Sequence, residues 1–176
     1  MSELTPTALV ESRIAVIPDF PTPGIVFRDL TPVFADGEAL RALAAELTAP
    51  FEGQFDVLAG LEARGFLLAA AASMLCGVGV LPVRKAGKLP RAVYRQDYAL
   101  EYGVAALEVH VDEVPQGTRV LIVDDVLATG GTVGAASALI ERAGWHVAGV
   151  SVALELEALA GRAALPGREI FSLLKY

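Results

Sequence analysis

The strongest constraint on the fold is an apolar run that passes directly into two carboxylates and a glycine turn. Residues Val120–Val123 are all apolar, which indicates a buried strand of a parallel sheet, because a strand covered on both faces need not alternate. Two aspartates, Asp124-Asp125, stand where that strand would end, and a Thr-Gly-Gly-Thr turn follows at 129–132. Residues 133–143 then carry a helix-compatible pattern, for which the last threonine of the turn is the expected N-cap.

A strand, a glycine turn and a helix start in this order predict an anion site. Backbone N–H groups and the positive end of the helix dipole point at one place, and the threonine hydroxyls add donors. Carboxylates repel phosphate, so we expect Asp124 and Asp125 to bind hydroxyls or a metal. Adjacent residues on a strand point to opposite faces, which favours hydroxyl binding, with a metal carried chiefly by the ligand's phosphates. The turn is neither a Walker A loop, since no lysine follows Gly130-Gly131, nor a G-x-G-x-x-G motif. A ligand with both a phosphate and a sugar diol fits this pattern.

The same order of elements occurs earlier in the chain. Residues 56–60 read as a second buried strand, which runs through the polar turn 61–65 into a helix from Phe66 to about Leu75. Arg64 in this turn is the expected charged donor of a second anion site. Further strands are expected at 78–83, 107–111, 147–154 and 170–174, and further helices at 3–17, after Asp36 and at 155–164. We therefore expect a single α/β domain over 1–176, with a mostly parallel central sheet flanked by helices and a ligand site beyond the carboxyl ends of its strands.

Three other segments are candidates for ligand binding. The cationic cluster Arg84–Arg91 follows a predicted strand at the same sheet edge, which favours an anion clamp over a solvated loop. Residues 92–103 have no clear core pattern, and a polar excursion of this length is commonly a lid or binding loop. Prolines between 18 and 23 favour a shaped loop leading to Phe27 and Arg28. From that segment alone, a packed aromatic beside a solvated charge is favoured over a pair that frames a planar ligand.

Composition restricts the class of protein. The net charge of −7 argues against a general nucleic-acid binder. Hydrophobic residues make up 54% of the chain and the mean hydropathy is +0.52, yet no uninterrupted apolar run reaches the roughly 18 residues of a membrane-spanning helix. The excess apolar content indicates a homo-oligomer interface. A single cysteine, Cys76, and no charged-then-apolar leader lead us to expect a cytoplasmic protein.

The chain also resembles a known family. Residues 120–132 are similar to the phosphoribosyl-pyrophosphate binding motif of the type I phosphoribosyltransferases. Segments 18–29, 62–66, 83–90 and 100–103 resemble, in the same order, those of the adenine phosphoribosyltransferases within that family. The similarity covers nearly the whole chain and thins at its ends and in 91–99. It implies the type I fold, with a small base-binding hood contributed by 1–34 and a flexible lid loop at 84–103.

The resemblance implies a role for individual residues. The 5′-phosphate would be held by Ala128, Thr129, Gly130, Gly131 and Thr132, and the ribose by Asp124 and Asp125. The pyrophosphate would be bound by Ala63, Arg64, Gly65, Arg84 and Lys88, where this family often has a non-proline cis peptide at the first three. The adenine would lie against Val26, Phe27, Arg28 and Val126. Glu101 resembles the family's acid–base residue, beside Tyr102 in the lid.

The implied activity is that of a glycosyltransferase of the pentosyl class. Adenine and phosphoribosyl pyrophosphate would give AMP and pyrophosphate, a reaction of purine salvage. Mg²⁺ would be bound with phosphoribosyl pyrophosphate, with no direct protein ligand. The family resemblance further implies a homodimer, across which Arg84 and Lys88 would reach the pyrophosphate, and neither nucleic acid nor a membrane is an expected partner.

Two alternatives share the phosphate site. A phosphoribosyltransferase for a 6-oxopurine such as hypoxanthine or xanthine would differ where the edge of the base is recognised, and the Val26–Arg28 segment favours adenine. A phosphoribosyl-pyrophosphate-sensing regulator would be expected to lose the pyrophosphate turn or the lid residue and to gain a basic face. This chain keeps Arg64 and Glu101 and is acidic, which disfavours the regulator.

Overall fold

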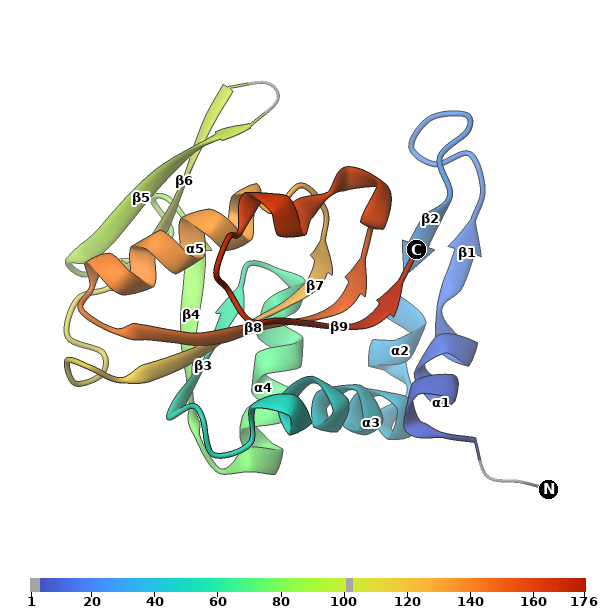
Figure 1. Ribbon diagram of the computed structural model, residues 1–176, viewed down its shortest axis with the longest axis horizontal. Coiled ribbons are helices and arrows are strands. Elements are labelled where there is room, and N and C mark those ends of the chain that lie inside the picture. Colours follow the sequence, from blue (N-terminus) through green and yellow to red (C-terminus); the bar gives the residue numbers. More distant parts are fainter. Residues whose placement is uncertain (1–3, 101–102) are drawn as a thin grey trace.

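The computed structural model describes residues 4–100 and 103–176, and its centre is a seven-stranded mixed sheet (Figure 1). The strand order is β5-β6-β4-β3-β7-β8-β9. Five strands run parallel: β3 (Val57–Leu61), β4 (Gly79–Lys85), β7 (Arg119–Leu127), β8 (His146–Glu155) and β9 (Ile170–Lys175). The other two, β5 (Val93–Leu100) and β6 (Gly103–His110), form an antiparallel hairpin that β6 joins to β4. The predicted α/β class and mostly parallel sheet are confirmed.

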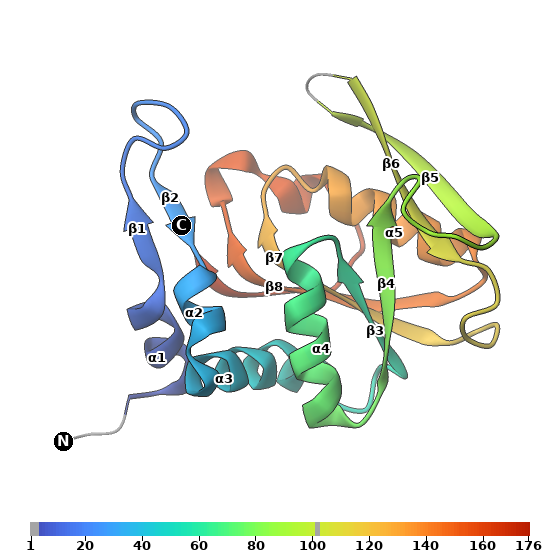
Figure 2. The same cartoon turned by 180° about the vertical axis from the view of Figure 1, so that it is seen from behind.

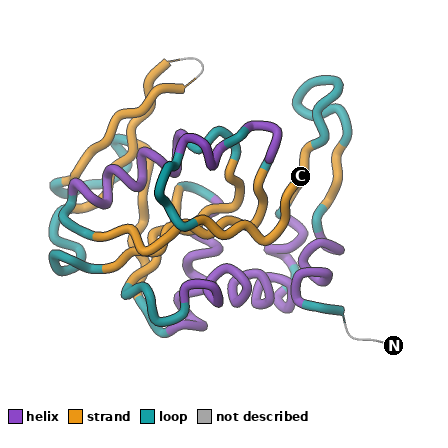
Figure 3. The backbone as a smooth tube through the Cα atoms, in the orientation of Figure 1, coloured by secondary structure: helices purple, strands orange, loops and turns teal. Residues whose placement is uncertain are grey.

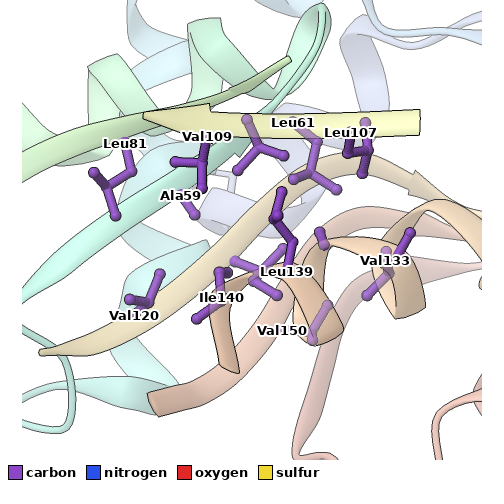
Figure 4. Close-up of a cluster of buried hydrophobic side chains, with 14 of the residues drawn as sticks. Ala59, Leu61, Leu81, Leu107, Val109, Val120, Val133, Leu139, Ile140 and Val150 are labelled. Atoms are coloured by element: carbon purple, nitrogen blue, oxygen red, sulfur yellow. The ribbon is translucent and has the colours of Figure 1, made fainter. Parts of the chain in front are cut away.

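Helices cover both faces of this sheet. Helices α3 (Gly37–Thr48) and α4 (Arg64–Cys76) pack on one face, and α5 (Gly131–Arg142) packs on the other (Figures 1 and 2). Val120 and Ile122 of β7 belong to the core cluster under α5, whose side chains are drawn in Figure 4, whereas Leu121 belongs to the cluster under α3 and α4. This two-sided burial is why the apolar run in β7 does not alternate. Within the described residues, no helix combines the length and the apolar character needed to cross a bilayer.

The amino-terminal part forms a small structure of its own beside the sheet. It comprises α1 (Pro6–Arg13), β1 (Ala15–Ile17), β2 (Phe27–Asp29) and α2 (Thr31–Ala35), and β1 pairs with β2 as a separate antiparallel ladder. The expectation of one helix over 3–17 is therefore wrong at its carboxyl end, where residues 15–17 form β1. Val16 pairs with Arg28, a partner 12 positions along the chain that a local helical pattern does not reveal.

Two other segments differ from expectation. Residues 92–103, expected to lack core structure, contain all of β5 and the first residue of β6, coloured as strand in Figure 3. Tyr94 and Tyr98 of β5 pack against the core. The expected helix at 155–164 is replaced by two short 3₁₀ turns, η2 (Glu157–Leu159) and η3 (Gly161–Ala164). A third such turn, η1 (Ala49–Phe51), follows α3. Ala160 separates η2 from η3 with a φ of +51°, a left-handed conformation that a continuous α-helix does not contain.

Candidate active site

The turn after β7 forms the first part of the site. Helix α5 begins at Gly131, with Gly130 at φ +83° as its N-cap and no side-chain cap, so the expected N-cap role of Thr132 is wrong. A cavity of about 70 Å³ lies in this turn and is lined by Asp124 and residues 126–133. The turn therefore has the open backbone concavity and the helix N-terminus that favour an anion.

A segment that the sequence did not single out lies against this turn. A Cβ atom on Gly161 would lie 2.2 Å from the carbonyl oxygen of Ala128, and one on Gly130 would lie 2.5 Å from the carbonyl oxygen of Gly161. Leu156 N–H also donates to Leu127 C=O at 2.9 Å. Residues 156–161 thus hold the back of the phosphate turn, and the only local signal was the glycine itself.

The turn between β3 and α4 forms the second part. Its Glu62–Ala63 peptide bond is cis, as the family resemblance implies for this position. A Cβ atom on Gly65 would lie 2.8 Å from Val123 O and 3.0 Å from Asp124 Oδ1, so glycine allows the two turns to approach closely. Arg64 Nε lies 2.7 Å from Asp125 Oδ2 and forms an ion pair with it. The structure therefore places the expected pyrophosphate turn against the expected ribose carboxylates.

Both carboxylates face one cavity. A space of about 410 Å³ is lined by Glu62, Ala63, Arg64, Lys85, Tyr98, Ala105, Leu107, Asp124, Asp125 and Thr132. Asp124 and Asp125 are adjacent on β7, and both contribute to the lining of this one cavity. Burial, and then the neighbouring charge of Asp125, raise the pKa of Asp124 well above its ordinary value. Asp124 and Thr132 line both cavities, which makes the two parts contiguous.

The basic segment after β4 is held by two acidic side chains. Glu62 accepts a hydrogen bond from Lys85 N–H at 2.9 Å, and Glu108 accepts one from Gly87 N–H at 2.8 Å. Burial alone raises the pKa of Glu62, but the Lys85 N–H and the Arg84 guanidinium outweigh it, and the pKa lies below its ordinary value. Arg84 Nε is buried and has no hydrogen-bond partner within the described residues, which suits a donor to an anionic ligand.

Not every predicted pyrophosphate residue reaches the cavity. Lys85 lines the cavity but was not among the predicted pyrophosphate residues. It lies in the sequence between Arg84 and Lys88, the two cations that the family resemblance implied. Arg84 contacts Glu62 beside the cavity, and Lys88 is exposed and outside the lining. Glu101 and Tyr102 lie outside the described residues.

The amino-terminal hood supplies the third part. Phe27 packs edge-on against Phe20, with ring centroids 5.3 Å apart, and Val26 is half exposed. Arg28 is not a solvated charge, because its guanidinium lies over the ring of Tyr176 at 3.5 Å. None of these residues lines the two cavities, whereas Val126 lines the smaller one. Hydrogen bonds from the Thr31 side chain and backbone lower the pKa of Asp29 at the base of the hood.

A metal held by protein side chains alone has no support in the described residues. In residues 4–100 and 103–176, no group of three or more His, Cys, Asp or Glu side chains is arranged to hold a metal ion.

A larger cavity, of about 580 Å³, lies among residues 45–55 and 75–78 near the amino ends of the strands and contains none of the predicted site residues.

Comparison with known proteins assigns this chain to a family. The Phosphoribosyl transferase domain family matches residues 34–163, and the chain belongs to that family. An adenine phosphoribosyltransferase of Arthrobacter sp. is 62% identical over 167 residues, covering 95% of this chain and 90% of that protein. Within the family, the chain belongs to the adenine phosphoribosyltransferases, which are pentosyltransferases.

Solved structures agree with this assignment. The adenine phosphoribosyltransferase of Thermoanaerobacter pseudethanolicus has a TM-score of 0.90 and 46% identity, covering 97% of this chain and 99% of that chain. The Saccharomyces cerevisiae enzyme, solved in complex with an imino-altritol bisphosphate and adenine, has a TM-score of 0.89 and 35% identity, covering 96% of this chain and 98% of that chain. The single-domain type I phosphoribosyltransferase fold is therefore confirmed.

Proposed function

We propose that this chain transfers the 5-phosphoribosyl group from phosphoribosyl pyrophosphate to adenine, giving AMP and pyrophosphate in purine salvage. The observation that carries the proposal is the ion pair of Arg64 with Asp125 at 2.7 Å, in a cavity that joins the phosphate turn through Asp124 and Thr132. This continuity supports a site in which donors for the phosphate groups lie beside acceptors for a diol. The adenine complex of the yeast relative supports the choice of base.

The proposed roles follow the chemistry of the cavity. Residues 128–132 hold the 5′-phosphate with backbone N–H groups, and Asp124 and Asp125 accept hydrogen bonds from the ribose hydroxyls. The cations of Arg64 and Lys85, with Arg84 beside the cavity, stabilise the charge that develops on the departing pyrophosphate. Positive charge develops at the same time on ribose C1, and the nearby carboxylates favour it.

The metal belongs to the substrate in this proposal. The carboxylates of Asp124 and Asp125 are assigned to the diol, which leaves Mg²⁺ to be held mainly by the phosphate oxygens of phosphoribosyl pyrophosphate. When bound there, Mg²⁺ adds charge neutralisation of the leaving group to that of the arginines and lysines.

Proton transfer and exclusion of water are assigned to the β5–β6 hairpin. Tyr98 of β5 and Ala105 of β6 line the same cavity as the pyrophosphate turn, so the hairpin borders the proposed site. Glu101, which lies outside the described residues, is proposed as the acid–base group that manages a proton on the base. Closure of the 84–103 segment would keep water from the reactive carbon.

Assembly and location are part of the same proposal. Leu67 and Met74 of α4 are 51% and 85% exposed, which supports a homodimer that covers this helix face. The single free cysteine supports a reducing, cytoplasmic location.

A substrate panel tests the choice of base. We expect kcat/KM for adenine to exceed that for hypoxanthine and guanine by about 10³-fold or more, because a site that pairs an amino group leaves buried groups unpaired against an oxo group. Turnover of hypoxanthine comparable to that of adenine would replace this assignment with the 6-oxopurine alternative. Tight binding of DNA or RNA at physiological salt, without turnover, would support the regulator instead.

A single substitution tests the acid–base role. Glu101→Gln is expected to lower kcat about 10²- to 10⁴-fold, while the KM for phosphoribosyl pyrophosphate changes by less than about threefold. Steady-state kinetics with a circular-dichroism check of folding measures both. Equal loss in both parameters, or undiminished kcat, would mean that Glu101 is not the acid–base group.

A further inference from the structure

The last strand of the sheet and the hood are joined by one stacked pair. The guanidinium carbon of Arg28 on β2 lies 3.5 Å from the centroid of the Tyr176 ring, next to the end of β9. The Tyr176 hydroxyl lies 3.5 Å from Glu11 Oε1 on α1. The ribbon shows this end of the chain beside β2 (Figure 1). Tyr176 therefore contacts two elements of the hood.

Tyr176 is firmly tied to the central sheet. Its backbone N–H donates to Glu155 C=O at 2.9 Å, and its C=O accepts from Glu157 N–H at 2.8 Å. These two partners flank Leu156, whose N–H donates to Leu127 C=O at the start of the phosphate turn at 2.9 Å. Backbone hydrogen bonds through residues 155–157 therefore connect the start of the phosphate turn to the backbone of Tyr176.

The hood strands have little else to fix their position. β1 and β2 contact chiefly each other and form a ladder separate from the seven-stranded sheet. The other links lie at the base of the hood, where Val10 is buried in the core and Arg13 pairs with Asp36 at 2.7 Å. Phe27 and Asp29 of β2 contact Phe20 and Thr31 within the hood, whereas the stack of Arg28 on Tyr176 joins β2 to the end of the seven-stranded sheet.

We propose that Tyr176 is a positioning residue for the base. Its ring holds the Arg28 side chain, and through it the β2 backbone, at a fixed distance from the ribose-phosphate turn. Arg28 and Phe27 are adjacent on β2 and point to opposite faces, so an Arg28 side chain fixed on Tyr176 also fixes the orientation of Phe27. This inference rests on the proposed function, in which the hood segment Val26–Arg28 binds adenine.

The proposal predicts an effect on one substrate only. Because Tyr176 acts on the hood, Tyr176→Leu should raise the KM for adenine about three- to tenfold, as expected for loss of a partly buried cation–π contact. The KM for phosphoribosyl pyrophosphate should change by less than about twofold, since residues 124–132 are not displaced. Tyr176→Phe keeps the ring and should restore the wild-type value, and Lys175→Ala, an exposed neighbour on β9, serves as the control.

Steady-state kinetics with each substrate varied in turn measures these values, and Arg28→Met tests the other half of the stack while keeping the β2 backbone. Arg28→Met should reproduce the effect of Tyr176→Leu, and the double variant should be no worse than either alone. If Tyr176→Leu fails to fold, Tyr176→Met, which keeps a long apolar side chain without the aromatic face, takes its place in the same comparison with Tyr176→Phe. An unchanged adenine KM, an equal rise in both KM values, or a Phe variant as poor as Leu would overturn the inference. Absence of adenine turnover in the wild-type protein would instead overturn the proposed function.

Discussion

The buried Asp124 carboxylate, when ionised, lowers the stability of the ligand-free protein, and we expect bound substrate to offset this effect. Burial and the charge of Asp125 raise its pKa, so the folded state binds a proton more tightly than the unfolded state. Its effect on stability is therefore absent below the ordinary carboxyl pKa of 3.8 and grows more unfavourable as the pH rises through the raised pKa. A ribose diol that donates hydrogen bonds to the carboxylate would offset this effect.

We expect Asp124→Asn to stabilise the ligand-free protein and to weaken phosphoribosyl-pyrophosphate binding about tenfold or more, since hydrogen bonds to a charged group are lost. Thermal unfolding between about pH 4 and about pH 8 should show a gain over wild type that increases with pH. Asp112→Asn, an exposed change of the same charge, is the control. A variant less stable than wild type at neutral pH would contradict this account.

At this scale the sequence revealed residue types better than their geometry. The paired aspartates, Arg64 and the cis bond before Ala63 were expected from the chain and its family resemblance, and they lie where expected. The role of Lys88 stays a prediction, and the position of Lys85 in the cavity lining was not foreseen, because the path of the basic turn depends on Glu108, which accepts a hydrogen bond from Gly87 N–H, 21 positions away. A contact of that separation leaves no local pattern.

Among the elements, the segment that follows β8 supports the phosphate turn from behind. Glu155 is 4% exposed, and Arg162 binds both of its carboxylate oxygens, at 2.7 Å and 2.8 Å. Ser172 on β9 also donates to Glu155, at 2.6 Å. This network fixes η3, and with it Gly161 against Ala128.

Gly161→Ala is expected to push the phosphate turn out of position, because the added carbon would lie 2.2 Å from Ala128 O. The KM for phosphoribosyl pyrophosphate should rise about tenfold or more, with a smaller change for adenine. Gly37→Ala is a matched control, since nothing lies within 4 Å of its added carbon. Wild-type kinetics in Gly161→Ala would show that this packing does not support the turn.

Elements with strong local signals were predictable, and those made by distant pairing were not. Asp36 caps α3 as expected, accepting from Glu38 N–H at 3.0 Å. The strand character of β5 was hidden by polar residues, although half-buried Tyr94, Gln96 and Tyr98 alternate with exposed Arg95 and Asp97. Its pairing with β6 and the packing of its tyrosines on the core outweigh that polarity.

At the scale of the whole molecule, helix α4 presents an exposed apolar face of the kind that is buried in protein interfaces. Leu67, Met74 and Leu75 are 51%, 85% and 45% exposed, and their spacing places them on one side of the helix. The high apolar content of the sequence anticipated such a surface but gave no position for it, because all-round hydrophobicity of α4 conceals which face is buried. The same helix begins at Arg64, so whatever covers this face also bears on the pyrophosphate turn.

We expect the protein to have twice the 18.4 kDa mass of the chain in solution and Met74→Glu to shift it to a monomer, because a buried unpaired charge is costly at a self-complementary interface. Light scattering coupled to size exclusion measures the mass, and Met74→Leu, which keeps the apolar contact, should remain dimeric. If cations reach the pyrophosphate across the interface, the Glu variant should also show a higher KM for phosphoribosyl pyrophosphate that falls with protein concentration. A Glu variant that stays dimeric would place the interface elsewhere, and a monomer with wild-type KM would mean that each chain forms its pyrophosphate site alone.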